Sequence, residues 1–170
     1  MASAWRALSA PVLVALALAL GGCVTLPEQI AVGTPRAELL QTLGQPTARY
    51  QPDPKSGVHE RLQYSMQPSG QTVYNFDLDA GGRLIRAQQA LNETLFGERI
   101  LPDRWTREDV LYEYGRPARI QGVHNFKGDI WVWRYVDGIT WRLLFIDVDP
   151  QGVVRGFSMG DDPQPEDRAP

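Results

Sequence analysis

Asp77-Leu78-Asp79-Ala80-Gly81-Gly82 has a pattern that returns 70 residues later as Asp147-Val148-Asp149-Pro150-Gln151-Gly152, and this repeat is the main sequence signal for the architecture. A second pair of motifs precedes it: Gly44-Gln45-Pro46 recurs as Gly115-Arg116-Pro117, 71 residues further along. Solenoid repeats have shorter periods. The spacing therefore predicts two tandem copies of one small supersecondary unit.

Each copy begins with a predicted helix that has sequence signals at both ends. Thr34 before Pro35 marks the first start, and Thr106, with Asp109 three residues on, marks the second. A threonine can cap free N–H groups, proline loses nothing at the first helical position, and the acid completes a capping box. A glycine then permits a left-handed stop, and a proline two residues on prevents the helix from resuming. These stop signals are Gly44, Pro46, Gly115 and Pro117.

Strands are predicted after each helix from β-forming residues separated by turn signals. Residues 61–66, 72–78 and 84–90 form the first set, and residues 130–136, 139–148 and 153–159 the second. Leu62-Gln63-Tyr64 and Trp133-Arg134-Tyr135 match between the sets at a spacing of 71. The predicted class is α+β, with two tandem modules, each a short helix or helix pair packed on a three-stranded antiparallel meander.

The chain is divided accordingly. We place a leader at residues 1–22, a tether at 23–32, the first module at 33–91, and a connector with the second module at 92–160. Residues 161–170 are acidic and proline-rich, and are predicted to be a disordered tail. A module of about 60 residues is marginal for independent stability. We therefore expect an interface shared by the two modules.

The first 23 residues predict export and a lipid anchor. One cation, Arg6, precedes an apolar run at residues 11–20, and two glycines precede Cys23. This is the layout of a secretory signal peptide, and the run is shorter than the ~20 residues that span a bilayer. Cys23 is the only cysteine, so it has no disulfide partner within the chain.

Leu20-Gly21-Gly22-Cys23 resembles the lipobox of bacterial lipoproteins. The resemblance implies cleavage before Cys23 and lipid on its sulfur and amine. It also implies the periplasmic face of a Gram-negative outer membrane, because Val24 stands where an inner-membrane signal has aspartate. Each buried methylene of the acyl chains contributes about 0.8 kcal/mol, so several chains would hold the protein on the leaflet.

Charge argues against a nucleic-acid partner. The full chain has a net charge of −3, and removal of Arg6 with the leader makes the mature chain −4. Nonspecific nucleic-acid binding requires a basic face. We therefore expect no nucleic-acid partner.

A family can be named from the motifs. A helix ending in Leu-Gly-x-Pro, a strand with an aromatic two residues before Tyr, and a Phe-Asp hairpin resemble the SmpA/OmlA module of BamE-like outer-membrane lipoproteins. The resemblance covers residues 29–90 and again 100–160. The outer-membrane assembly lipoprotein from which this family takes its name has one module, whereas this chain has two. Tyr114 also stands where the family pattern prefers leucine. The tandem arrangement is also similar to the β-lactamase inhibitor protein. The resemblance implies membership of the superfamily rather than identity with the assembly factor.

Candidate catalytic or metal-binding residues are few. The alternating acids of the two Asp-x-Asp motifs suggest a calcium loop, but positions five and twelve lack the required ligands. Acids at a hairpin turn explain these motifs better. His59 and His124 lie in corresponding loops without a nearby acidic cluster, and no serine has a Gly-x-Ser-x-Gly setting. We predict no catalytic residue, no metal site, no cofactor and no small-molecule substrate.

Aromatic residues are the candidate partner-binding set. Trp131, Trp133 and Tyr135 share one face of a strand by the period of two. Core packing is favoured for them, and an exposed patch for a protein partner is the alternative. Trp105 is expected to be exposed, because it precedes the second helix and joins no helical stripe.

Two functions remain open from the sequence. The family resemblance implies a non-catalytic scaffold that binds an envelope protein, in outer-membrane protein assembly or envelope integrity. The resemblance to the β-lactamase inhibitor protein implies an inhibitor or sensor that plugs a periplasmic enzyme. The inhibitor would need exposed loops, such as Asp53-Pro54 or the loop from His124 to Phe126.

The lipid anchor is tested by Cys23→Ser. Without the thiol the lipobox has no acceptor for lipid, so we expect the protein to be released from the membrane or to remain uncleaved. Membrane fractionation and the mass of the N-terminus measure this. Normal outer-membrane fractionation of the variant would contradict the lipoprotein prediction.

Overall fold

The computed structural model describes residues 27–52 and 56–163. The predicted leader, Cys23 and residues 164–170 of the predicted tail lie outside the described residues. Among the described helices, none combines the length and the apolar character needed to cross a bilayer.

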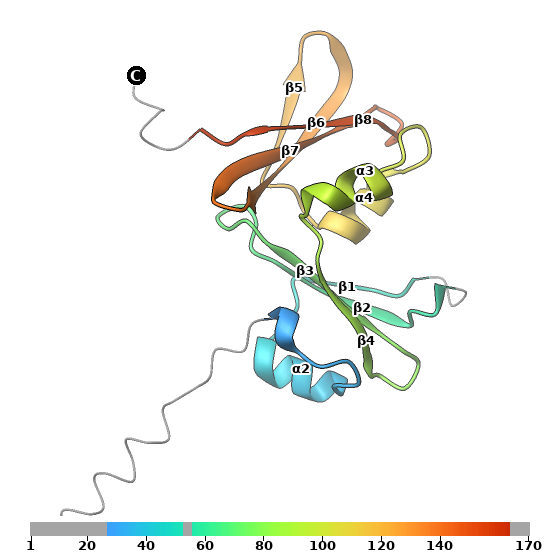
Figure 1. Cartoon of the computed structure of the whole chain (residues 1–170). Helices are drawn as coiled ribbons and strands as arrows, with labels where there is room; N and C mark the ends of the chain where they lie inside the picture. The colour runs from blue at the N-terminus through green and yellow to red at the C-terminus, as the bar shows by residue number, and fades with distance from the viewer. Residues whose placement is uncertain (1–26, 53–55, 164–170) are drawn as a thin grey trace, which may run out of the picture.

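The predicted α+β class and the two-module arrangement are confirmed (Figure 1). The first module contains a 3-10 turn, one helix and four strands: η2 (Pro27–Gln29), α2 (Arg36–Leu43), β1 (Ala48–Tyr50), β2 (Glu60–Ser65), β3 (Val73–Leu78) and β4 (Leu84–Gln89). The second contains a connector helix, one further helix and four strands: α3 (Glu93–Arg99), α4 (Arg107–Tyr114), β5 (Arg119–Val123), β6 (Phe126–Asp137), β7 (Thr140–Val148) and β8 (Val154–Asp161).

Each sheet is an antiparallel meander of four strands, ordered β1-β2-β3-β4 and β5-β6-β7-β8, rather than the three strands predicted. The additional strands, β1 and β5, follow the prolines that end helices α2 and α4. Thr47 N–H donates to Gln63 O at 2.8 Å, and Ala118 N–H donates to Val132 O at 2.8 Å. The chain therefore pairs with the next strand as soon as it has passed each proline.

The duplication is visible in matched backbone hydrogen bonds. The N–H at the start of each helix donates to the turn before the last strand: Arg36 to Gly82 O at 2.9 Å, and Arg107 to Gly152 O at 2.7 Å. Asp79 and Asp149 each accept two backbone N–H groups of their own turn through Oδ1. These acids therefore shape the turns, which is the role favoured over a calcium loop.

The strand register corrects one part of the repeat. Leu62 pairs with Phe76, and the corresponding pair in the second sheet is Trp131 with Ile146. The counterpart of Leu62 is therefore Trp131, not Trp133 as the motif match predicted. A shift of two residues keeps the same face of the strand, which is why the aromatic motif matched out of register.

The two helix starts differ. Thr34 does not cap α2: Pro35 is the residue before the helix, and the Thr34 hydroxyl donates to Ala31 O at 2.7 Å. The carbonyl of Thr34 accepts Leu84 N–H at 2.9 Å, which holds this residue in an extended chain beside β4. The capping box at Thr106 is confirmed, since the Asp109 carboxylate accepts the Thr106 N–H at 2.7 Å.

Both helix-ending glycines have the predicted positive φ, 77° at Gly44 and 67° at Gly115. Their ψ angles of −158° and −164° are extended, so neither is the left-handed helical stop that was predicted. This combination is essentially restricted to glycine. It turns the chain abruptly toward the proline two residues on.

The helices lie in separate layers. Helix α2 packs on one face of the first sheet, and α3 and α4 lie between the two sheets (Figure 1). The first core is apolar and contains Leu39, Leu62, Phe76, Leu78 and Leu84. The second core combines α3, α4 and the inner face of the second sheet with Val73, Ala90 and Leu91 from the first module or its end. The expected shared interface is therefore a common core.

The ordered chain extends past the predicted start of the tail at residue 161. Strand β8 includes Asp161, and Asp162 is buried. Arg134 Nε donates to Asp162 Oδ2 at 2.6 Å, and Asp162 N–H donates to Trp141 O at 2.9 Å. This ion pair keeps the acidic residue within the fold.

Alanine at the two glycines should reveal how closely the modules approach. A Cβ at Gly115 would lie 2.6 Å from Gln63 Oε1, whereas at Gly44 it would meet nothing within 4 Å. Backbone strain should cost about 1–3 kcal/mol at either site. Overpacking should cost Gly115→Ala a further ~1–3 kcal/mol. Urea unfolding measures both, with Gly44→Ala as the matched control, and equal losses would contradict the close approach.

Candidate functional site

The aromatic strand residues belong to the core. Trp133 and Tyr135 are fully buried, and Trp131 is 5% exposed. Their side chains face α3 and α4: Trp133 Nε1 donates to Tyr114 O at 3.0 Å, and the Tyr135 hydroxyl donates to Glu93 Oε1 at 3.2 Å. The partner-patch alternative for these residues is wrong, and the core-packing prediction is confirmed.

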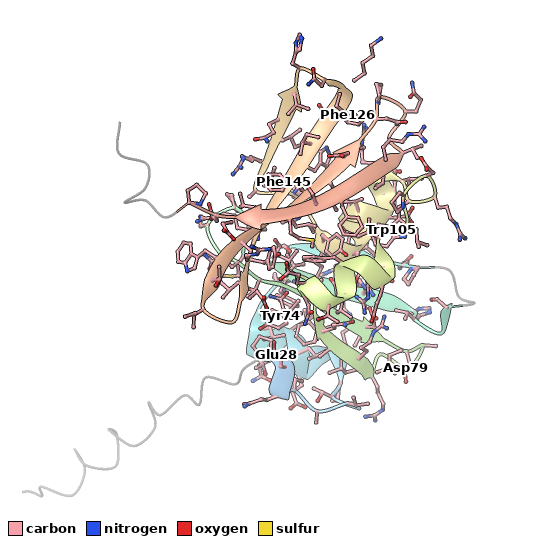
Figure 2. The ribbon with its side chains drawn as sticks, turned by 45° about the horizontal axis from the view of Figure 1, so that its top comes forward. Glu28, Tyr74, Asp79, Trp105, Phe126 and Phe145 are labelled. Carbon is pink, nitrogen blue, oxygen red and sulfur yellow. The ribbon has the colours of Figure 1, made fainter. Side chains whose placement is uncertain are left out.

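Trp105 is half-buried rather than exposed. Its ring packs against the second core, 6.1 Å from the Tyr114 ring. The residue is held there because its carbonyl accepts Val154 N–H at 2.9 Å, the counterpart of the Thr34 bond in the first module. Trp105 is therefore not a free anchor for a partner (Figure 2).

The residues at the junction of the modules were not predicted. The carboxyl end of α4 points its last carbonyls at a polar face of the first sheet. Tyr50 OH donates to Leu111 O at 2.9 Å, Gln63 Nε2 to Tyr112 O at 3.2 Å, and Asn75 Nδ2 to Glu113 O at 2.8 Å. Helix ends leave such carbonyls without intrahelical partners. The side chains of β1, β2 and β3 thus cap a helix of the other module.

Arg61 is the centre of this contact. Its guanidinium is buried and donates to both oxygens of Asp77, at 2.6 and 3.1 Å, and to Glu113 Oε2 at 2.9 Å. It also lies 3.9 Å from the centre of the Tyr112 ring. Burial alone would raise the pKa of Asp77, but the bonds from Arg61 and Arg86 outweigh it and hold that pKa below its ordinary value. The cluster therefore stays charged at neutral pH.

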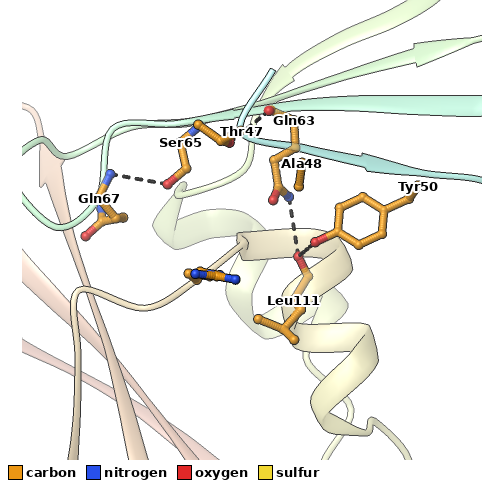
Figure 3. Close-up of a pocket in the computed structure, with 8 residues that line it drawn as sticks. Thr47, Ala48, Tyr50, Gln63, Ser65, Gln67 and Leu111 are labelled. Carbon is orange, nitrogen blue, oxygen red and sulfur yellow. Dashed lines mark hydrogen bonds between the residues drawn. The ribbon is translucent and has the colours of Figure 1, made fainter. Parts of the chain in front are cut away.

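A groove runs beside this contact, which we call the junction groove (Figure 3). It consists of two adjoining hollows of about 630 and 500 Å³ that share Tyr50 and Leu111. The larger hollow is lined mainly by polar side chains: Thr47, Gln63, Ser65, Gln67 and Arg116. The smaller one is lined by Pro52 and Tyr112 and also by two acids, Glu108 and Asp109.

Arg116 is the cation among the residues that line the junction groove. The side chain is exposed and lines the larger hollow. Within residues 27–52 and 56–163 it has no carboxylate or hydrogen-bond partner, unlike Arg61. Hydroxyl and amide groups beside one cation can hold a peptide backbone and a carboxylate. The sequence offered one signal, since Arg116 stands in the repeated Gly-x-Pro motif where the first copy has Gln45.

Among the described residues no three His, Cys, Asp or Glu side chains gather closely enough to hold a metal ion. His124 is exposed in the turn between β5 and β6, while Asp53 and Pro54 lie outside the described residues.

Comparisons with known proteins add little. No protein-family model matches the chain, and no curated protein matches it. Among solved structures, the chain is similar to the crystal structure of a DUF4309 family protein, YjgB, from Bacillus subtilis subsp. subtilis str. 168. The two share 14% identity over 76% of this chain and 79% of that chain, with a TM-score of 0.29.

Acid should destabilise the fold through Asp77. Its pKa in the fold is lowered, whereas in the unfolded chain it is about 3.9. The unfolded state therefore takes up the proton first, and the stabilisation is complete above about pH 5 and is lost as the pH falls through the folded pKa.

Urea unfolding between pH 7 and pH 3 measures this effect. Asp77→Asn should lower stability at pH 7 by about 1–3 kcal/mol, because the buried Arg61 then keeps only Glu113 as a carboxylate partner, and should flatten the dependence on pH. Asp129→Asn, at an exposed position on β6, is the control. A wild-type slope in Asp77→Asn would contradict the assignment.

Proposed function

We propose that this chain is a lipid-anchored periplasmic protein of the BamE-like superfamily that binds an envelope protein as a non-catalytic scaffold. The observation that carries the proposal is the junction groove, in which the unpaired cation Arg116 and the Ser65 hydroxyl lie beside a hollow lined in part by Pro52 and Tyr112. The predicted lipidation at Cys23 supports the location, because it would place the first module near the outer membrane after a tether of ten residues.

The lining of the junction groove suits an extended polypeptide. The Ser65 hydroxyl, which accepts Gln67 N–H at 3.2 Å, can still donate to a partner's backbone, whereas the Thr47 hydroxyl and the Gln67 amide already bond to Gln63 O and to the Arg134 backbone. Arg116 can bond to a carboxylate, which would come from an acidic side chain or a chain end. The smaller hollow, with Tyr112 and Pro52, can take an apolar side chain.

The inhibitor alternative is less well supported. The resemblance to the β-lactamase inhibitor protein implies a concave sheet that plugs an enzyme, together with exposed loops, of which the described residues contain the turn at His124. The described strands form two separate sheets, with helices α3 and α4 between them. We therefore favour the scaffold, and place it in outer-membrane protein assembly or envelope integrity.

The proposal is tested by site-specific photocrosslinking in cells. A photoreactive residue at Ser65, in the junction groove, should give an adduct with one envelope protein, identified by mass spectrometry. Arg116→Glu should reduce that adduct at least about tenfold, since charge-assisted bonds contribute at this level. Arg104→Glu is the matched control, at an exposed arginine outside both hollows. Crosslinking that Arg116→Glu leaves unchanged would contradict the groove as the binding site.

A further inference from the structure

The outer face of the second sheet, turned away from α3 and α4, carries a further apolar cluster. Ile130, Val132 and Leu143 are buried there, with Phe126 and Phe145 packed partly exposed against them. Among the described elements, no helix covers this face; Figure 2 labels Phe126 and Phe145 on this half of the molecule. We call it the Asp147 face, after the one acid that lies among these residues.

The first sheet shows what the corresponding face does. There the strand register places Arg61 opposite Asp77 and Gln63 opposite Asn75. In the second sheet the same register places Ile130 opposite Asp147 and Val132 opposite Phe145. In the first sheet, helix α4 covers the face through bonds from Arg61, Gln63 and Asn75. In the second sheet, apolar residues replace those three polar side chains.

Asp147 is an acid that the second sheet retains, although the arginines that would pair with it have been replaced. Its counterpart Asp77 accepts bonds from Arg61 and from Arg86. The counterparts of these arginines are Ile130 and Gly156, neither of which can donate from a side chain. Asp147 is half-buried, and no hydrogen bond or ion pair joins its carboxylate to the rest of the described chain. Burial raises the pKa of this carboxyl, which means that the isolated fold disfavours its charged form.

We propose that the Asp147 face docks an α-helical segment of another protein that presents one arginine or lysine among apolar side chains. A helix fits because α4 covers the corresponding face of the first sheet. A cation fits because it would give Asp147 the partner that Asp77 already has. Apolar neighbours fit because Phe145, two residues from Asp147 on β7, is half-buried on this face, and Phe126 packs in the same apolar cluster.

A second copy of the chain is a poorer occupant. In a head-to-tail pair, α2 of one copy would pack on the Asp147 face of the other copy, as α4 packs on the first sheet within one chain. At the positions where α4 presents Tyr112 and Glu113, α2 presents Gln41 and Thr42, which are neither apolar nor cationic. The Arg36 side chain on α2 is already paired with Glu60 at 2.7 Å.

The docking is tested with two synthetic helical peptides in a fluorescence anisotropy titration against the full mature chain. Both are hydrocarbon-stapled and fluorescein-labelled, with one arginine among leucines or with citrulline in its place. The arginine peptide should bind at least about tenfold more tightly, because only it offers a full charge to the carboxylate. Asp147→Asn should abolish that difference and should raise the melting temperature of the free protein, since it removes an uncompensated charge. Asp129→Asn, on the opposite face of β6, should change neither.

Several results would overturn the proposal. These are equal binding of the two peptides, no binding of either, or an arginine preference that survives Asp147→Asn. Binding that emerges only after removal of residues 164–170 would make the chain's own C-terminal segment the occupant. Self-association lost in Phe145→Glu would make it a second copy. The junction groove does not contain Asp147, so crosslinking from Ser65 remains an independent test of the proposed function.

Discussion

The carboxyl end of helix α4 needs hydrogen-bond donors from outside the helix, and this requirement fixes how the two modules pack. The carbonyls of Leu111, Tyr112 and Glu113 receive theirs from the first sheet, and that of Tyr114 from Trp133 in the second. A buried carbonyl left unpaired costs about 1–3 kcal/mol. The modules therefore cannot slide past each other without breaking several bonds at once, and Arg61 adds a buried charge to the same contact.

The contact between the modules is head to tail, since a helix of the second packs on the sheet of the first. This geometry accounts for both candidate surfaces, the junction groove and the Asp147 face. Helix α4 bridges two sheets, whereas its counterpart α2 packs on one (Figure 1). A heterologous contact uses two different surfaces, so a chain of two modules leaves one of each kind free. The free sheet surface is the Asp147 face. The junction groove lies at the edge of the used contact, where short strand β1 ends beside α4.

Features set by neighbours in sequence were predictable, and features set by distant residues were not. The glycine turns, the capping box at Thr106 and the core role of Trp133 follow from local patterns. Strand β1 was missed because its three residues carry little periodicity. The junction was missed because Asn75 and Glu113 meet only after both modules have folded, 38 residues apart in the chain. Judged from its sequence alone, a polar strand such as β2 looks like a solvent-exposed strand, so its burial against α4 could not be predicted.

The shared core also bears on the order in which the chain folds during synthesis. Val73, Ala90 and Leu91 are buried against the second module, which the ribosome makes later. Until α4 has been synthesised, Arg61, Gln63 and Asn75 of the first sheet face water. Polar side chains at these positions can be hydrated during that time. An apolar face at this position would invite aggregation of the half-made protein. The polar junction thus limits the apolar surface that the first module exposes before the second is made to residues such as Val73, Ala90 and Leu91.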